Sequence, residues 1–128
     1  RLDSRVFYFG VATSPATLPS TGTAVYTGTM SGVHSPFSQV AYSLSGLARL
    51  EVDFDETSVR GALTDIDMSS IVQGDRTSLP DIGFAAEIEG NQIVGPNVLG
   101  TFFGPGGDEI GGVYRNSETI AAFGVRRE

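Results

Sequence analysis

The chain has 128 residues, a formal net charge of −7 and no cysteine. This length fits one domain, residues 1–128, that can bury a core without disulfides, and the lack of cysteine also excludes thiolate metal sites. The acidic balance argues against nucleic acid as a partner, because phosphate binding needs a positive face. No apolar run reaches the roughly 20 residues that a membrane helix needs.

The first third of the chain alternates strand and loop patterns. Residues 5–11 (RVFYFGV) predict a short aromatic strand, and residues 13–21, rich in Pro, Ser and Thr, predict a loop. Residues 22–33 have the two-residue period of a strand. Residues 34–42 lack that period, so we expect a longer connection with room for a short helical turn.

The middle of the chain holds the clearest strand signal. In residues 46–55 (GLARLEVDFD) the apolar side chains share one face and the charged side chains share the other. A polar turn leads into a second strand at residues 59–66. Residues 67–80 predict another long connection, and residues 82–89 predict the next strand.

The last third predicts four more short strands separated by tight turns. They cover residues 93–95, 97–104, 109–115 and 119–127. The chain therefore has eight or nine strands at hairpin spacing, which predicts an all-β fold: a single closed antiparallel β-barrel of about eight strands.

Glycines lie within the apparent strands, close to aromatic residues. Glycine permits the bends of a closed sheet and leaves room for a large neighbour, so this pattern predicts a barrel whose interior is filled by side chains. Gly104–Gly107 lacks the following helix and lysine of a phosphate-binding loop. The terminal Arg126, Arg127 and Glu128 are expected to meet water. The strand glycines are Gly28, Gly32, Gly61, Gly100, Gly111 and Gly112.

The C-terminal third resembles a known family. Its run GTFFGPGGDEIGGVYRN, followed by the closing FGVRR, is similar to the signature of the transferrin-binding protein B β-barrel. Upstream, Tyr26-Thr27-Gly28 and Val52-Asp53-Phe54 resemble two strands of that barrel. The matching C-terminal positions are Gly100, Phe102, Phe103, Gly104, Pro105, Glu109, Gly111, Gly112, Tyr114, Phe123, Gly124, Arg126 and Arg127.

The resemblance implies a non-catalytic binding module at the outer membrane surface or outside a Gram-negative cell, with the periplasm as an alternative location. Its implied partner is an extracellular protein, in host-protein binding or in iron or haem acquisition. Contact with a membrane would come only through a lipid anchor upstream of Arg1. Two alternatives stay open: a carrier of a small apolar ligand such as haem, with a lipocalin-like cavity, and a structural or export module.

Three loops at one end of the barrel are the predicted binding region: residues 13–21, 34–39 and 67–80. Their candidate ligand-binding residues are His34, Phe37, Asp67, Met68 and Arg76. His34 is the only histidine and therefore the natural haem ligand to test. Apart from haem, no cofactor is expected.

Catalysis and metal binding have little support. No Gly-x-Ser-x-Gly motif and no EF-hand loop is present, so no catalytic residue is assigned. Asp53, Asp55 and Asp65 form an acidic patch in the sequence and are the first candidates for a metal site. Carboxylates at alternate strand positions more often form a solvated face, which is the preferred interpretation.

Overall fold

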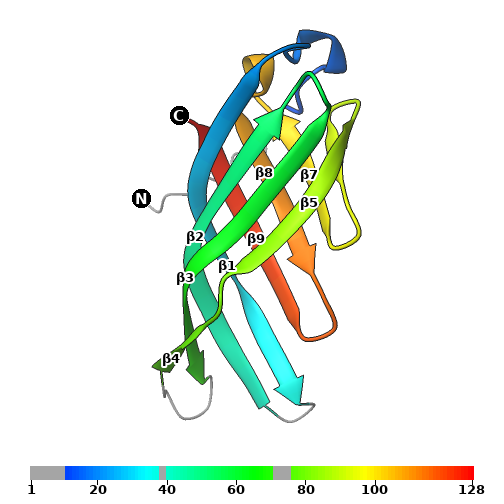
Figure 1. Cartoon of the computed structure of the whole chain (residues 1–128). Helices are drawn as coiled ribbons and strands as arrows, with labels where there is room; N and C mark the ends of the chain where they lie inside the picture. Colours follow the sequence, from blue (N-terminus) through cyan, green and yellow to red (C-terminus); the bar gives the residue numbers. More distant parts are fainter. Residues whose placement is uncertain (1–10, 38–39, 71–75) are drawn as a thin grey trace.

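A computed structural model describes residues 11–37, 40–70 and 76–128 (Figure 1). Within them the chain is almost entirely β-structure, with two single 3-10 turns at Pro15–Thr17 and Pro105–Gly107. The strands are β1 (Thr23–Phe37), β2 (Val40–Asp53), β3 (Ser58–Ser70), β4 (Arg76–Leu79), β5 (Ile82–Glu89), β6 (Gln92–Val94), β7 (Val98–Phe103), β8 (Glu109–Arg115) and β9 (Thr119–Arg127).

Eight of these strands close into an antiparallel barrel. The hydrogen-bonded order is β2-β1-β9-β8-β7-β6-β5-β3, and β3 pairs back with β2. The pairing of β1 with β9, from Tyr26↔Arg127 to His34↔Thr119, joins the first strand to the last. β4 is an additional strand on β3. The predicted all-β fold with a closed barrel is therefore confirmed.

In the described residues, two predicted connections belong largely to strands, while their residues 38–39 and 71–75 lie outside the described part. Residues 34–42 contain the end of β1 and the start of β2, while residues 67–80 contain the end of β3 and all of β4. These extended ends form a ribbon below the rest of the barrel (Figure 1). Of the strand predicted at residues 5–11, residues 5–10 lie outside the described part of the chain, and Val11 itself lies outside any strand.

A β-bulge explains why the two-residue period of β3 does not continue into residues 67–70. The β2–β3 register shifts between Ser45 and Leu47, and Asp65 on β3 has φ of +50°. The extra residue changes which residues face inward, so that Leu63 and Ile66 are both buried although three positions separate them. A strict two-residue period cannot continue across such a site.

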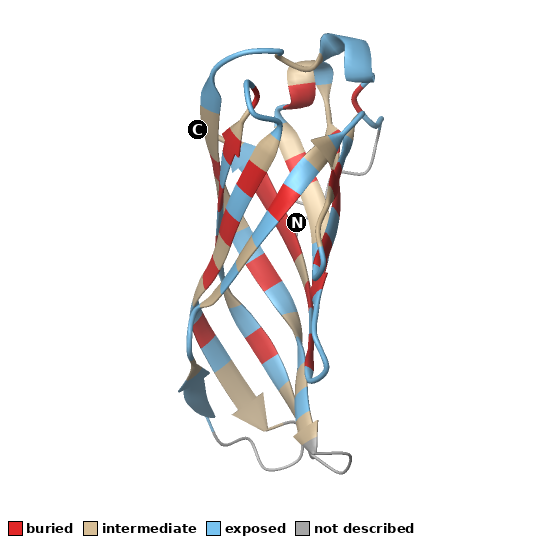
Figure 2. Ribbon diagram, turned by 45° about the vertical axis from the view of Figure 1, so that its right-hand side comes forward, coloured by how far each residue is buried: buried red, intermediate tan, exposed pale blue. Residues whose placement is uncertain are grey.

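The barrel interior is filled by side chains. Buried and exposed residues alternate along the strands, and the buried ones concentrate away from the β4 ribbon (Figure 2). Phe123 stacks on Phe84 with ring centroids 5.8 Å apart, and Phe102 lies between Tyr26 and Phe54 at 6.2 and 6.1 Å. The largest fully buried side chains are Tyr26, Phe102, Phe123, Leu50, Leu63, Ile66, Ile93, Ile110, Val52 and Val125.

Two glycines show how the interior is filled. A Cβ added to Gly61 would lie 2.2 Å from Cζ of Phe84, so this glycine makes room for an aromatic ring. A Cβ added to Gly28 would lie 1.9 Å from the carbonyl oxygen of Gly124, so this glycine lets β1 approach β9 closely. Gly61 thus has the predicted role of leaving room for a large neighbour, whereas Gly28 permits close approach of two backbones.

Candidate functional site

The barrel has two distinct ends. We call the end with the β2–β3 turn the Asp55 end, and the end where β1 finishes the His34 end. The loop at residues 13–21 lies at the Asp55 end, because Ala12 pairs with Phe103 and the amide of Phe54 donates to the carbonyl of Gly22. The described residues of the other two predicted loops belong to the His34 end (Figure 1). The expectation of three binding loops at one end is therefore wrong.

The structure separates the predicted ligand-binding residues by face. His34 and Met68 lie on the inner face of the His34 end, whereas Asp67 and Arg76 lie on the outer face of β3 and β4. Asp67 Oδ2 and Arg76 Nη2 are 3.7 Å apart, and both side chains are more than half exposed. Phe37 pairs with Val40 at the end of β1, and its side chain lies outside the described part.

His34 is held in a polar contact at the mouth of the barrel. Its Nδ1 lies 2.8 Å from Oγ1 of Thr119, which is 97% buried at the start of β9. The ring of Tyr42 lies 6.4 Å from the imidazole, between centroids. Met68 is on the same inner face, one strand further along. Nε2 of His34 has a lone pair for a ligand only in the tautomer in which Nδ1 carries the proton and donates it to Oγ1 of Thr119.

The fold does not bring the acidic candidates Asp53, Asp55 and Asp65 into one group. Asp53 Oδ1 accepts a hydrogen bond from the amide of Glu56 at 3.1 Å, and Asp55 Oδ2 accepts one from the amide of Gly22 at 2.9 Å. Both carboxylates thus fix backbone at the Asp55 end, while Asp65 sits at the bulge. Over the residues that the structure describes, no group of three metal-ligating side chains comes together.

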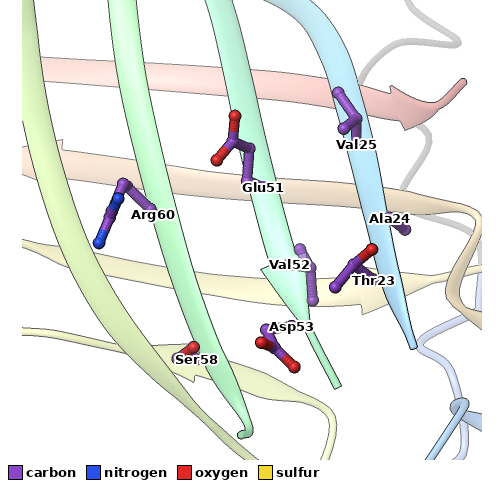
Figure 3. Close-up of a pocket in the computed structure, with 8 residues that line it drawn as sticks. All are labelled: Thr23, Ala24, Val25, Glu51, Val52, Asp53, Ser58 and Arg60. Atoms are coloured by element: carbon purple, nitrogen blue, oxygen red, sulfur yellow. The ribbon is translucent and has the colours of Figure 1, made fainter. Parts of the chain in front are cut away.

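A shallow hollow of about 380 Å³ opens on the outer face of β1, β2 and β3 (Figure 3). Glu51 and Arg60 lie on neighbouring strands at its wall, with Val25 on the other side of Glu51. Glu51 pairs with Arg49, and this hydrogen bond lowers the pKa of the Glu51 carboxyl. The alternation in residues 46–55 predicts that Glu51 faces the solvent, but it does not indicate a hollow.

A second hollow, of about 490 Å³, opens on the outer face of β7 and β8. Its wall includes Leu99 and Val113, which are directly opposite one another and 58% and 40% exposed. Arg115 also lines this hollow. This hollow was not predicted from the sequence, because only the register of β7 with β8 places Leu99 opposite Val113 on one outer face.

The sequence from residue 18 to residue 127 matches the family described as the C-lobe and N-lobe β-barrels of Tf-binding protein B. The chain belongs to this family. The match covers the whole barrel, from the loop before β1 to the end of β9, and it confirms the resemblance seen in the C-terminal run.

Solved structures agree with the family assignment at the level of the fold. Transferrin-binding protein B of Haemophilus parasuis, as its Trp-176-Ala mutant, superposes with a TM-score of 0.70 at 20% identity, over 92% of this chain and 28% of that one. The isotype 1 protein from serogroup B Neisseria meningitidis gives 0.59 at 15% identity, over 92% and 33%.

A lactoferrin-binding protein has a domain with a similar fold. The N-lobe domain of lactoferrin-binding protein B of Moraxella bovis gives a TM-score of 0.59 at 17% identity, over 85% of this chain and 60% of that one. This barrel thus spans only part of the length of each of these proteins. No protein with a curated description matches the sequence. Where the structure is described, no helix has the length and apolar character needed to cross a membrane.

Proposed function

We propose that this member of the transferrin-binding protein B barrel family is a non-catalytic module that binds an extracellular protein partner at a Gram-negative cell surface. Host iron carriers of the transferrin and lactoferrin type are the first candidates, because structurally similar proteins are named for binding them. The observation that carries the proposal is the family match over residues 18–127. A barrel filled by aromatic side chains also favours contact with a partner through its outer surface.

Direct binding tests the proposal. The chain would be immobilised, and apo- and iron-loaded transferrin and lactoferrin would be passed over it, with serum albumin as the control. We expect saturable binding of at least one iron carrier and none of albumin. Equal retention of albumin, or no binding to any carrier at micromolar concentration, would contradict the proposal. Protease accessibility on intact cells that produce the full-length protein would test the surface location.

Haem capture is a second candidate, supported by the inner face of the His34 end. His34, Tyr42 and Met68 carry three side-chain types that ligate haem iron, and they share one face of three neighbouring strands. Haem titration followed by absorbance would show a Soret shift that depends on His34. No shift, or a shift that is unchanged in His34→Ala, would eliminate histidine-ligated haem.

A further inference from the structure

The outer face of β1, β7, β8 and β9 carries an exposed apolar patch of two side-chain pairs at the His34 end. We call it the Leu99 patch, formed by Val33, Leu99, Val113 and Ile120. Leu99 lies opposite Val113, and Val33 lies opposite Ile120. Each of the four side chains is at least 40% exposed. Contiguous exposed apolar side chains on a soluble protein commonly mark an interaction surface.

The Leu99 patch adjoins a hollow whose wall includes the side chain of Arg115. Leu99 and Val113 belong both to the patch and to the 490 Å³ hollow, together with Arg115. The backbone of Arg115 is fixed by two hydrogen bonds with Asn97, of 2.8 and 2.9 Å. Its guanidinium is exposed and forms no hydrogen bond or ion pair with the rest of the described chain. Arginine beside apolar side chains is a typical composition of a binding hot spot.

The distribution of charge over the barrel indicates which charge the partner carries. Residues 40–89 contain ten of the fifteen acidic residues and three arginines, whereas residues 91–128 contain four acidic residues and three arginines. The wall that carries the patch is therefore much less acidic than the opposite wall. An unpaired guanidinium next to apolar side chains complements a carboxylate next to an apolar side chain.

A second copy of the chain fits this surface poorly. A symmetric dimer through the Leu99 patch would place the two Arg115 side chains near its axis, like charge against like charge. We propose that the Leu99 patch and Arg115 together bind a segment of a partner protein that presents a large apolar side chain flanked by a carboxylate. The inference rests on the proposed function only in taking the partner to be a protein.

The test is a titration of isotope-labelled protein with three capped tetrapeptides, followed by amide chemical shifts. The probes are Glu-Leu-Phe-Glu, its charge-reversed form Lys-Leu-Phe-Lys, and the form without apolar side chains, Glu-Ser-Ser-Glu. We expect only Glu-Leu-Phe-Glu to shift the amides of Leu99, Val113 and Arg115. Arg115→Gln and Leu99→Thr should each weaken its binding by about fivefold or more.

Two control variants match these changes. Arg60→Gln removes an exposed arginine from the opposite wall, and Leu47→Thr removes a leucine that is 49% exposed outside the patch. Both should bind the peptide as the wild type does. Equal shifts with all three peptides, equal weakening by the controls, or a wild-type dimer that Leu99→Thr dissociates would overturn the inference. Binding of an iron carrier that Arg115→Gln and Leu99→Thr leave intact would also overturn it, while supporting the proposed function.

Discussion

The guanidinium of Arg127 lies over the ring of Tyr26 inside the Asp55 end of the barrel. Arg127 Cζ is 5.4 Å from the ring centroid, and Nη2 donates a 2.9 Å hydrogen bond to the Tyr26 hydroxyl. Nη2 also donates to the carbonyl of Gly106, and the Tyr26 hydroxyl donates to that of Gly107. The expectation that Arg127 meets water is therefore wrong: this side chain fixes the Pro105–Gly107 turn against the interior.

Truncation of Arg127 should destabilise the barrel. Arg127→Ala removes the hydrogen bonds and the cation–π contact, and we expect a loss of about 1–3 kcal/mol in the free energy of unfolding. Arg127→Met keeps an apolar stem and should fall between the wild type and the alanine variant. Arg60→Ala, on the exposed outer face, should change stability by less than about 0.5 kcal/mol. Urea denaturation measures all three, and equal losses for Arg127→Ala and Arg60→Ala would refute the role of Arg127.

The stability of the barrel should fall in strong alkali because of Tyr26. Burial raises the pKa of the Tyr26 hydroxyl above its usual 10, against the opposing hydrogen bond and charge of Arg127. In the unfolded chain tyrosine loses its proton near pH 10. The stabilisation is therefore complete below about pH 10 and is lost as the pH rises through the higher pKa of the folded state.

The measurement is the free energy of unfolding from about pH 8 to about pH 11. Tyr26→Phe has no proton to lose at this position, so its stability should decline less steeply with pH than that of the wild type. Identical slopes for the two proteins would show that Tyr26 does not carry the effect.

Glycines on adjacent strands should respond differently to alanine. Gly61→Ala places a Cβ 2.2 Å from Cζ of Phe84, a ring that also stacks on Phe123, and overpacking of this kind costs about 1–3 kcal/mol. Gly83→Ala meets nothing nearer than a carbonyl oxygen at 3.9 Å and should be tolerated. Thermal unfolding compares the two. Adding Phe84→Leu to Gly61→Ala should recover part of the loss, and no recovery would argue against this contact.

The bond between His34 and Thr119 should contribute measurably to the pairing of β1 with β9. Thr119→Val keeps the shape but removes the buried hydroxyl, at an expected cost of about 0.5–1.5 kcal/mol. In a double-mutant cycle with His34→Ala, the two changes should cost less together than the sum of their separate costs. Strict additivity would mean that the two side chains are not coupled.

The strands with an unbroken two-residue period could be predicted from sequence. The predicted limits of 82–89, 109–115 and 119–127 agree with β5, β8 and β9. In each, inward apolar residues alternate regularly and a turn rich in Gly, Asn or Ser closes the hairpin. The role of the strand glycines could be predicted in part as well, since Gly61 makes room for Phe84.

The extended ribbon could not be predicted in this way. The bulge at Asp65 changes the inward parity of β3, and the register of β1 with β2 shifts between His34 and Phe37. Hydrogen bonding to neighbouring strands, which the sequence does not display, decides their conformation. The relative placement of the loops is likewise a property of the closed barrel and not of any one segment.

Predicting which side chains lie on the outer surface required both the inward–outward alternation of each strand and the charge of each residue. Phe123, Val125 and Arg127 share the inner face of β9, but the charge of Arg127 favoured the prediction of a position in water. Leu99 and Val113 face outward from β7 and β8, on the exposed side of the sheet. Only the register of β7 with β8 shows that they form one exposed surface beside Arg115.

The most direct test of this account is the set of nuclear Overhauser contacts between β1 and β9, together with those inside the barrel. The structure predicts contacts between Met30 and Phe123, which are paired across these strands, and between the stacked rings of Phe84 and Phe123. It also predicts slow amide exchange along β9. Missing contacts between β1 and β9, with fast exchange from Thr119 to Arg127, would contradict a closed, filled barrel and the outer-surface binding proposed from it.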